Sequence, residues 1–359
     1  MEPVGKITER ENFFRLMRHE QPDFMPHQPS LLQMIIPSAI GDRAENCGTG
    51  YDWFGVHWTE DPSMPMMPMV TPGMDPVLED IEDWEDVIEW PDLDAIDWEA
   101  CAKKDVPVKD PSKILCAMMV SGPFERLHDL MGFEEALCAL VTNPEECEAF
   151  FSRLCDFKIE QIKRLKKYYD VDMVHFQDDW GTQNDLMFQP EVWRTLIRPH
   201  VKRVVDAAHE LGVLFDQHSC GKIDRIVGDV VDMGIDVLDP VQPVNDLPRW
   251  IEEYKDKVIF MGALDAQNVI DDPEATDEAI MAEVKEKIDL FGNADARFIP
   301  FAVSLTPNVM KALDDCYVYG RTFYSDKYAD DVEAFKVEAA ARAGQPMKMG
   351  TVPGTDMNQ

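Results

Sequence analysis

The 359-residue sequence contains no apolar run that approaches the roughly 20 residues needed to cross a lipid bilayer. Its N-terminus also lacks the apolar core of a signal peptide. Positive charge is scarce, because 34 Lys and Arg residues face 69 Asp and Glu residues and leave a net charge of −35. Nucleic acids and anionic membranes bind basic surfaces, so we exclude both as partners and expect a soluble, cytoplasmic protein.

Two further kinds of motif are missing. The eight cysteines form no CxxC pair and show no spacing of a disulfide framework, so we expect reduced thiols. No GxGxxG and no GxxxxGK[ST] follows an apolar run, which disfavours dinucleotide-binding and P-loop folds. The hydrophobic content of 45% is that of a globular protein with a sizeable core.

From about residue 113 the chain alternates between short apolar runs and helical stretches. The runs that we expect to be strands are 114–122, 172–179, 213–218, 234–239, 258–263 and 297–303. The helices expected between or after them cover 144–167, 190–211, 222–232, 246–255 and 276–291, with a further one from Thr306; Pro199 should kink the second. This alternation favours parallel strands with right-handed crossovers. With one or two strands upstream, it predicts the α/β class and a single (β/α)8 barrel of the TIM type.

We expect residues 1–110 to be an N-terminal segment integral to this barrel, 111–345 to be the barrel body and 346–359 to be a disordered tail. The N-terminal segment begins with a helix over 7–20, for which Thr8 and Glu11 form a capping box. A short segment over 24–29 is expected to enter a sheet edge or to form the first barrel strand. The Trp-rich, acidic stretch over 45–110 shows no strand–helix alternation and is expected to be a lid.

The stretch Val213–Lys222 carries the clearest chemical signal. It is an apolar strand that ends in His218, Cys220 and then Gly221. In an extended chain, residues two apart point to the same side, so an imidazole and a thiolate can meet at one point. This ligand pair suits zinc. A structural role for both residues is the alternative.

Polar side chains follow three further strands. Gln177, Asp178 and Asp179 end one strand and precede Trp180, while Gln242 and Gln267 follow two others. In a (β/α)8 barrel the carboxyl ends of the strands form the active site, so these side chains should converge.

Roles can be proposed for these residues. Asp178, Asp179 and His218 are the expected catalytic groups, and either aspartate can be a general acid or base. His218, Cys220 and Asp179 are the expected metal ligands; the third ligand is left open, with Cys316 as the weaker alternative. The expected substrate contacts are His27, His57, Trp58, Gln177, Trp180, Gln242 and Gln267.

Five stretches together resemble the uroporphyrinogen decarboxylase-like superfamily: His175–Gln183, His218–Gly221, Leu238–Pro243, Gly262–Gln267 and Thr306–Asn308. The resemblance covers nearly the whole chain and implies a (β/α)8 barrel. The Asp-Asp-Trp-Gly-Thr-Gln motif and the lid are similar to the corrinoid-dependent methyltransferases, in particular the O-demethylases. This implies transfer of a methyl group from a small methoxylated, aromatic substrate to cob(I)alamin, with zinc bound by the enzyme. The corrinoid (cobalamin) would be supplied by a separate corrinoid protein; a homo-oligomer is left open.

Other functions remain as alternatives. A uroporphyrinogen-type decarboxylase would need an arginine-rich N-terminal motif to hold the substrate carboxylates, and 27–33 lacks it. A methylcobalamin:thiol methyltransferase of the coenzyme M type would need a distant cysteine where Phe298–Ala302 stands. A non-catalytic barrel that binds a corrinoid or tetrapyrrole is the third alternative.

Overall fold

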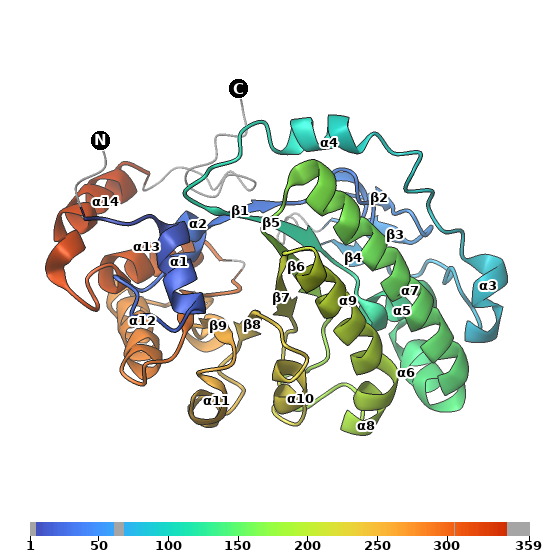
Figure 1. The fold of residues 1–359 in the computed structure, drawn as a ribbon. Coiled ribbons are helices and arrows are strands. Elements are labelled where there is room, and N and C mark those ends of the chain that lie inside the picture. Colours follow the sequence, from blue (N-terminus) through green and yellow to red (C-terminus); the bar gives the residue numbers. More distant parts are fainter. Residues whose placement is uncertain (1–4, 61–67, 305, 343–359) are drawn as a thin grey trace. The chain divides into compact units, whose positions relative to one another are not determined.

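The computed structural model describes residues 5–60, 68–304 and 306–342. Within these residues, seven strands, β1 and β5 to β10, alternate with helices along the chain, and neighbouring strands in each part pair in parallel (Figure 1). The predicted α/β class is therefore confirmed, whereas the eighth strand, the closed barrel and the lid stay predictions. The chain forms two compact units, one of residues 34–109 and 115–235 and one of residues 1–33, 110–114 and 236–359. The expected tail, 346–359, lies outside the described residues.

In the unit of 34–109 and 115–235, three parallel strands form the core. They are β5 (Ile114–Met119), β6 (Met173–Gln177) and β7 (Leu214–His218), with β6 in the middle. Most residues of the strand bodies are buried and apolar, as expected for strands that are covered on both faces, and the polar His175, Asp216 and Gln217 are buried among them. The helices that follow β5 in this unit are α5 (Pro123–Met131), α6 (Phe133–Thr142), α7 (Pro144–Arg164), α8 (Pro190–Val192), α9 (Arg198–Glu210) and α10 (Val227–Val231).

The helices α7 and α9 lie side by side (Figure 1). Arg203 of α9 joins them, because its guanidinium donates to Ser152 Oγ over 3.1 Å and pairs with Asp156 on α7. A π-helical turn, η4 (Trp193–Ile197), separates α8 from α9. Pro199 occupies the first turn of α9, directly after this π-helical turn, and the kink predicted at Pro199 stays a prediction. A second π-helical turn, η3 (Leu165–Tyr169), follows α7.

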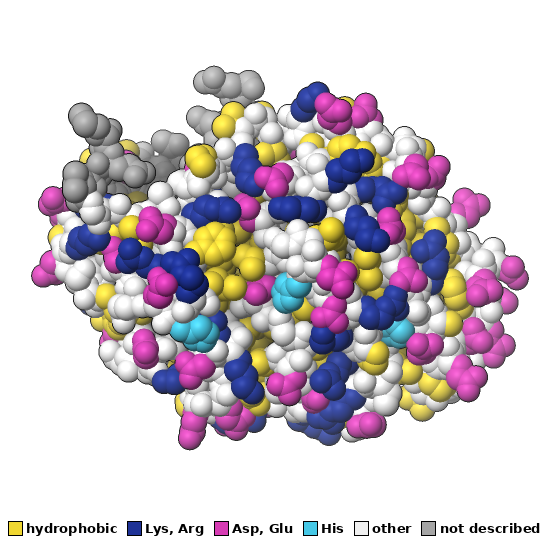
Figure 2. All heavy atoms as spheres, viewed as in Figure 1, with side chains coloured by type: hydrophobic (Ala, Val, Ile, Leu, Met, Phe, Trp, Pro, Cys, Tyr) yellow, Lys and Arg dark blue, Asp and Glu magenta, His cyan; other side chains and the backbone are white. Residues whose placement is uncertain are grey.

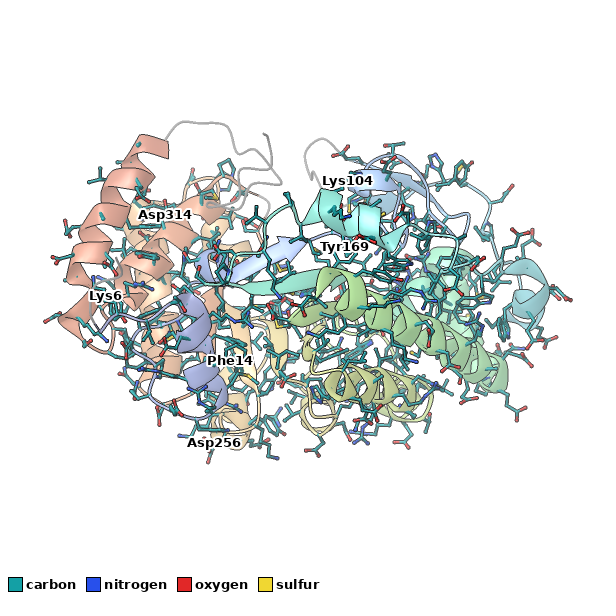
Figure 3. All side chains as sticks on the ribbon, turned by 45° about the horizontal axis from the view of Figure 1, so that its top comes forward. Lys6, Phe14, Lys104, Tyr169, Asp256 and Asp314 are labelled. Carbon is teal, nitrogen blue, oxygen red and sulfur yellow. The ribbon has the colours of Figure 1, made fainter. Side chains whose placement is uncertain are left out.

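The acidic, Trp-rich segment is packed against α7. It contains η1 (Glu45–Cys47), the antiparallel strands β2 (Gly50–Tyr51), β3 (His57–Thr59) and β4 (Met69–Val70), η2 (Ile81–Asp83), α3 (Trp84–Val87) and α4 (Trp98–Asp105). The Trp84 ring lies 5.8 Å from that of Phe150, and the Trp90 ring lies 5.4 Å from that of Phe157. The Tyr169 hydroxyl donates to Asp105, and Figure 3 shows Tyr169 beside the helix that carries Lys104.

The acidic side chains of this segment are exposed: Glu79, Asp80, Glu82, Asp83, Glu85, Asp86 and Glu89. Figure 2 shows acidic groups gathered at the edge of the view where α3 lies. On the face of Figure 2, basic and acidic side chains are otherwise interspersed.

The other unit contains the parallel strands β8 (Val237–Val241), β9 (Ile259–Ala263) and β10 (Phe298–Phe301), with β9 in the middle. Its helices are α1 (Glu9–Met17), α2 (Gln28–Leu31), α11 (Leu247–Tyr254), η5 (Ala266–Ile270), α12 (Asp277–Gly292), α13 (Asn308–Gly320), η6 (Asp326–Tyr328) and α14 (Ala329–Arg342). Thr8 caps α1 as predicted, because its hydroxyl accepts the Glu11 N–H over 3.1 Å.

The prediction of a first strand near 24–29 is wrong. Residues 28–31 form α2, and the strand β1 runs over Leu32–Ile35. Pro29 stands in the first turn of α2, where its fixed φ suits a helix and its missing N–H is not needed. None of the helices in the described part of the chain combines the length and apolar character that a membrane-spanning segment requires.

Candidate functional site

The carboxyl ends of β6 and β7 lie against each other. In their parallel register, Gln177 is the partner of His218. Backbone pairing continues beyond the strands, because the Asp178 N–H donates to the His218 carbonyl over 3.1 Å and the Gly181 N–H to the Cys220 carbonyl over 3.2 Å. The two loops that follow the strands are therefore held together, and residues in corresponding positions become neighbours.

Two glycines allow this close approach. A Cβ on Gly221 would lie 2.3 Å from the carbonyl carbon of Gly181, and a Cβ on Gly181 would lie 2.6 Å from the Lys222 nitrogen. Gly221 also has a φ of +85°, which L-residues with side chains rarely adopt. Only glycine fits at the point where the loops cross.

Three side chains meet just before this crossing: Asp179, His218 and Cys220. Their nearest ligand atoms all lie within 4.8 Å of one another. Cys220 Sγ is 3.4 Å from His218 Nε2, which is 3.7 Å from Asp179 Oδ1. The same Asp179 oxygen accepts the Cys220 N–H over 2.7 Å, which fixes the carboxylate beside the sulfur. The structure thus brings together the three residues that the sequence suggested as metal ligands.

This donor set fits zinc. One nitrogen, one sulfur and one oxygen are ligands that Zn²⁺ takes in proteins, and a three-ligand set leaves a fourth position for a reactant. Ligand atoms around a tetrahedral zinc ion lie about 3.5 Å apart, given bond lengths of about 2.0 Å to nitrogen and 2.3 Å to sulfur. The observed separations of 3.4 and 3.7 Å are close to that spacing.

Asp178 faces away from this cluster and is fully buried. Its Oδ1 accepts the Glu125 N–H at the start of α5 over 2.9 Å, and its Oδ2 accepts the indole N–H of Trp180 over 2.7 Å. Gly122 permits the contact with α5, because a Cβ there would lie 2.5 Å from Asp178 Cβ. Burial, reinforced by the negative charge of Glu125, raises the pKa of Asp178 well above its usual range. The geometry gives Asp178 a structural part in holding the loop.

Glu125 connects the loop after β6 to the start of α5. Its Oε1 accepts the Gln177 side-chain amide over 3.1 Å and the Asp179 N–H over 3.3 Å. Its Oε2 accepts the Ser121 N–H over 3.1 Å and lies 3.6 Å from an Arg43 nitrogen. Burial, and next the negative charge of Asp179, raise the pKa of this carboxyl. The sequence analysis missed Glu125, because an acidic residue in the first turn of a helix is ordinary.

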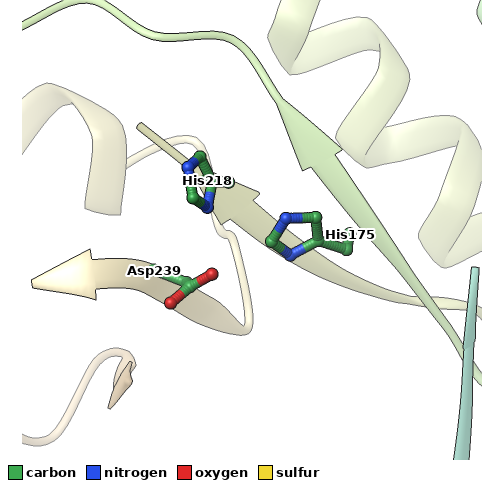
Figure 4. Close-up of side chains that lie close together, drawn as sticks. All are labelled: His175, His218 and Asp239. Carbon is green, nitrogen blue, oxygen red and sulfur yellow. The ribbon is translucent and has the colours of Figure 1, made fainter. Parts of the chain in front are cut away.

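A second missed residue is His175, in the body of β6. Its Nδ1 lies 2.7 Å from an oxygen of the buried Asp216. Figure 4 shows His175 beside His218, and the centres of the two rings lie 4.9 Å apart. The carboxylate orients the ring and favours the tautomer with the proton on Nδ1. The signal was available, because residues 175, 177 and 179 share one side of an extended strand.

The other predicted residues of this unit have packing partners. Trp58 is 2% exposed, donates its indole N–H to Asp52 over 3.0 Å and carries the Arg43 guanidinium 3.9 Å from its ring. Trp180 is fully buried. His57 lies on the opposite face of β3 from Trp58, with its Nδ1 2.7 Å from the Thr71 hydroxyl.

Four predicted residues belong to the other unit. His27 is buried beside the rings of Tyr317 and Phe335, with its Nδ1 2.7 Å from Ser30 Oγ. Gln242 follows β8 and is half-buried, and Gln267 is exposed in η5. Cys316 is buried in α13, where burial raises the pKa of its thiol. The substrate and catalytic roles assigned to all these residues stay predictions.

Comparison with known proteins shows which fold and which family this chain resembles. A solved structure of a methyltransferase from Methanosarcina mazei superposes with a TM-score of 0.66 at 14% identity, covering 89% of this chain and 100% of that one. At this identity the likeness concerns the fold. A structure of L-ribulose 3-epimerase reaches a TM-score of only 0.35, at 11% identity over 72% of this chain and 87% of that one. No curated protein matches the sequence. The family model for uroporphyrinogen decarboxylase (URO-D) matches residues 67–302, about two thirds of the sequence, and the chain therefore belongs to the URO-D family.

Proposed function

We propose that this protein is a methyltransferase that removes the methyl group from a small methoxylated, aromatic substrate and passes it to cob(I)alamin on a separate corrinoid protein. The observation that carries the proposal is the convergence of Asp179, His218 and Cys220 at the carboxyl ends of two parallel strands. The likeness in fold to a methyltransferase supports it further.

The three side chains would hold a zinc ion. Bound there, zinc would act as a Lewis acid toward the ether oxygen of the substrate. The cluster is suited to this because Asp179 and Cys220 are partly exposed, so that a substrate can reach them, while His218 is buried and the backbone behind the three residues is fixed by the paired loops.

The reaction itself needs a good nucleophile and a stabilised leaving group. The methyl carbon would receive an electron pair from cob(I)alamin, the methyl acceptor on the partner protein, which would leave in its methylated form. The C–O bond would break, its electrons would remain on the phenolate oxygen, and that oxygen would take a proton from water. We assign the charge stabilisation to the neighbourhood of His218 and His175, in which Asp216 holds the His175 proton at Nδ1. Asp178 would keep the loop in place instead of exchanging protons, since both its oxygens accept buried N–H groups.

Decarboxylation of a porphyrinogen is the second candidate, because the family model bears that name. Such a substrate carries several carboxylates and needs cations to receive them. The buried cations of this unit are already engaged: Arg126 donates to Asp52 and Lys158 to Asp42, both over 2.7 Å. Arg43 lies 3.1 Å from Asp129. These pairings disfavour the decarboxylase.

The test compares both reactions on anaerobically purified protein. In the first assay a panel of methoxyarenes serves as methyl donors, and the absorbance of cob(I)alamin reports its methylation. In the second assay uroporphyrinogen is the substrate, and product analysis reports decarboxylation. We expect methylation with at least one methoxyarene, lost in His218→Ala and Cys220→Ala and kept in Cys138→Ala, which removes an exposed thiol on α6. Decarboxylation without methylation would replace the proposal by the second candidate. If the protein showed neither activity, and if His218→Ala left its contribution to the pathway unchanged in cells, a non-catalytic role in corrinoid binding would be favoured.

A further inference from the structure

A cavity of about 620 Å³ lies in the unit that contains β8, β9 and β10. Its wall includes Asp289 near the end of α12, Tyr319 near the end of α13, and Phe323 and Tyr324 just beyond. Because α12 leads from β9 to the start of β10, its last turn lies near the amino end of β10. The cavity is therefore remote from the carboxyl ends of these strands, and its volume is typical of small-molecule sites.

Three aromatic rings form one side of the cavity. The Phe323 ring packs on Gly292, where a Cβ would lie 2.4 Å from the ring. Its centre is 6.1 Å from that of Tyr319 and 4.9 Å from that of Tyr324, with interplanar angles of 66° and 82°. All three rings are only half-buried, so surface remains on them for a ligand.

The charge of the wall has one sign. Asp289 accepts the Tyr319 hydroxyl over 2.7 Å, and Asp295 is exposed at the rim. No Lys, Arg or His lines the cavity, and within the described part of the chain neither aspartate forms an ion pair. Burial raises the pKa of both Tyr319 and Tyr324 to about 12, so both phenols are neutral at physiological pH. The wall thus offers carboxylates and neutral rings.

We propose that this cavity binds a small organic cation with an alkylammonium group. The faces of aromatic rings attract cations, and the two carboxylates add to that attraction, whereas an anion would be repelled. The Lys285 ammonium lies 5.5 Å from the centre of the Tyr319 ring, although Lys285 does not line the cavity. The inference is independent of the function proposed for the Asp179, His218 and Cys220 cluster.

The test uses choline as the probe and its uncharged isostere, in which a tert-butyl group replaces the trimethylammonium group. Binding is measured by isothermal titration calorimetry and by saturation-transfer NMR. We expect choline to bind saturably and at least about tenfold more tightly than the isostere, because only the cation interacts with rings and carboxylates. Equal binding of the two, or no saturable binding of choline, would overturn the proposal.

Variants locate the site. Asp295 has a φ of 56°, which asparagine tolerates, so Asp295→Asn removes the charge with little strain. We expect Asp295→Asn and Tyr324→Leu each to weaken choline binding about fivefold or more. The control variants are Tyr324→Phe, which keeps the ring, and Glu278→Gln, which removes an exposed charge outside the cavity; both should keep the affinity within about twofold. His218→Ala should leave binding unchanged. Choline would bind elsewhere if His218→Ala abolished its binding. The same conclusion would follow if Asp295→Asn and Tyr324→Leu left its binding unchanged.

Discussion

The backbone N–H of Cys220 donates to Oδ1 of Asp179 over 2.7 Å, and this bond joins the two loops that carry the candidate metal ligands. The same oxygen lies 3.7 Å from His218 Nε2. Cys220, in the loop after β7, therefore orients the carboxylate of Asp179, in the loop after β6. The sulfur of Cys220 lies within 4.8 Å of that carboxylate. The cluster depends on this pairing as much as on its three side chains.

Removal of any of the three ligands should lower zinc affinity by more than about 100-fold, because loss of even a residue that only supports a ligand costs 10- to 100-fold. The variants are Asp179→Ala, His218→Ala and Cys220→Ala, with Cys138→Ala as the thiol control. Zinc content by mass spectrometry and competition with a chelating dye measure the effect. Wild-type affinity in Asp179→Ala would show that another group supplies the third ligand.

Gly221→Ala should disrupt the site more than Gly212→Ala. Both glycines have positive φ, but a Cβ on Gly212 meets nothing within 4 Å, whereas one on Gly221 would lie 2.3 Å from the Gly181 backbone. We expect Gly212→Ala to cost about 1 kcal/mol of unfolding free energy, from its backbone conformation alone. Gly221→Ala should cost more than about 3 kcal/mol and abolish zinc binding. Urea unfolding and zinc titration distinguish the two; equal costs would contradict the steric argument.

Glu125→Gln should weaken zinc binding roughly tenfold although Glu125 is no ligand, the size of effect known for groups that support ligands. Its Oε1 accepts from both Gln177 and the Asp179 N–H, and a side-chain amide would place a donor among these donors. Glu134→Gln on α6 is the exposed control. Zinc affinity is the readout, together with the circular dichroism spectrum, which should not change. A variant with normal affinity would exclude this positioning role.

Asp178→Ala should destabilise the protein by about 2–5 kcal/mol, because it leaves the Glu125 N–H and the Trp180 indole N–H buried without their acceptor. Asp178→Asn keeps one acceptor oxygen and should cost less. Chemical unfolding followed by tryptophan fluorescence measures both. A fully stable Asp178→Ala that lacks methyl transfer would instead assign Asp178 to the chemistry.

The free energy of unfolding should depend on pH through Glu9. Burial raises the pKa of Glu9 from 4.5 to about 7, although Arg321 acts in the opposite direction. The folded state then binds the proton more tightly than the unfolded state, so this stabilisation is complete below pH 4.5 and is lost as the pH rises through about 7. The loss amounts to roughly 3 kcal/mol.

Glu9→Gln should remove that part of the pH dependence, because the amide does not titrate. Urea unfolding of both proteins across this pH window gives the two slopes. Parallel slopes would show that another group is responsible.

Sequence patterning indicated the alternation of strands and helices from β5 onward, because buried strands need continuous apolar runs. The helices α5 and α6, between β5 and α7, were not predicted. The capping of α1 by Thr8 follows from local chemistry and was predicted correctly. The expectation that the side chains of His218 and Cys220 lie close together was also a local inference, because residues two apart in an extended chain point to the same side. The misplaced first strand shows the limit of such rules: Pro29 suits a strand edge and a first helical turn equally well.

Only the tertiary structure decided between Asp178 and Asp179. The two are adjacent in sequence, but the register of β6 on β7 and the contact with α5 turn Asp178 into the core and Asp179 toward His218. The parts played by Glu125 and Asp216 were likewise invisible, since each depends on a residue about 40 to 50 positions away in the chain. Such long-range contacts arise from packing, and no local pattern in the sequence encodes them.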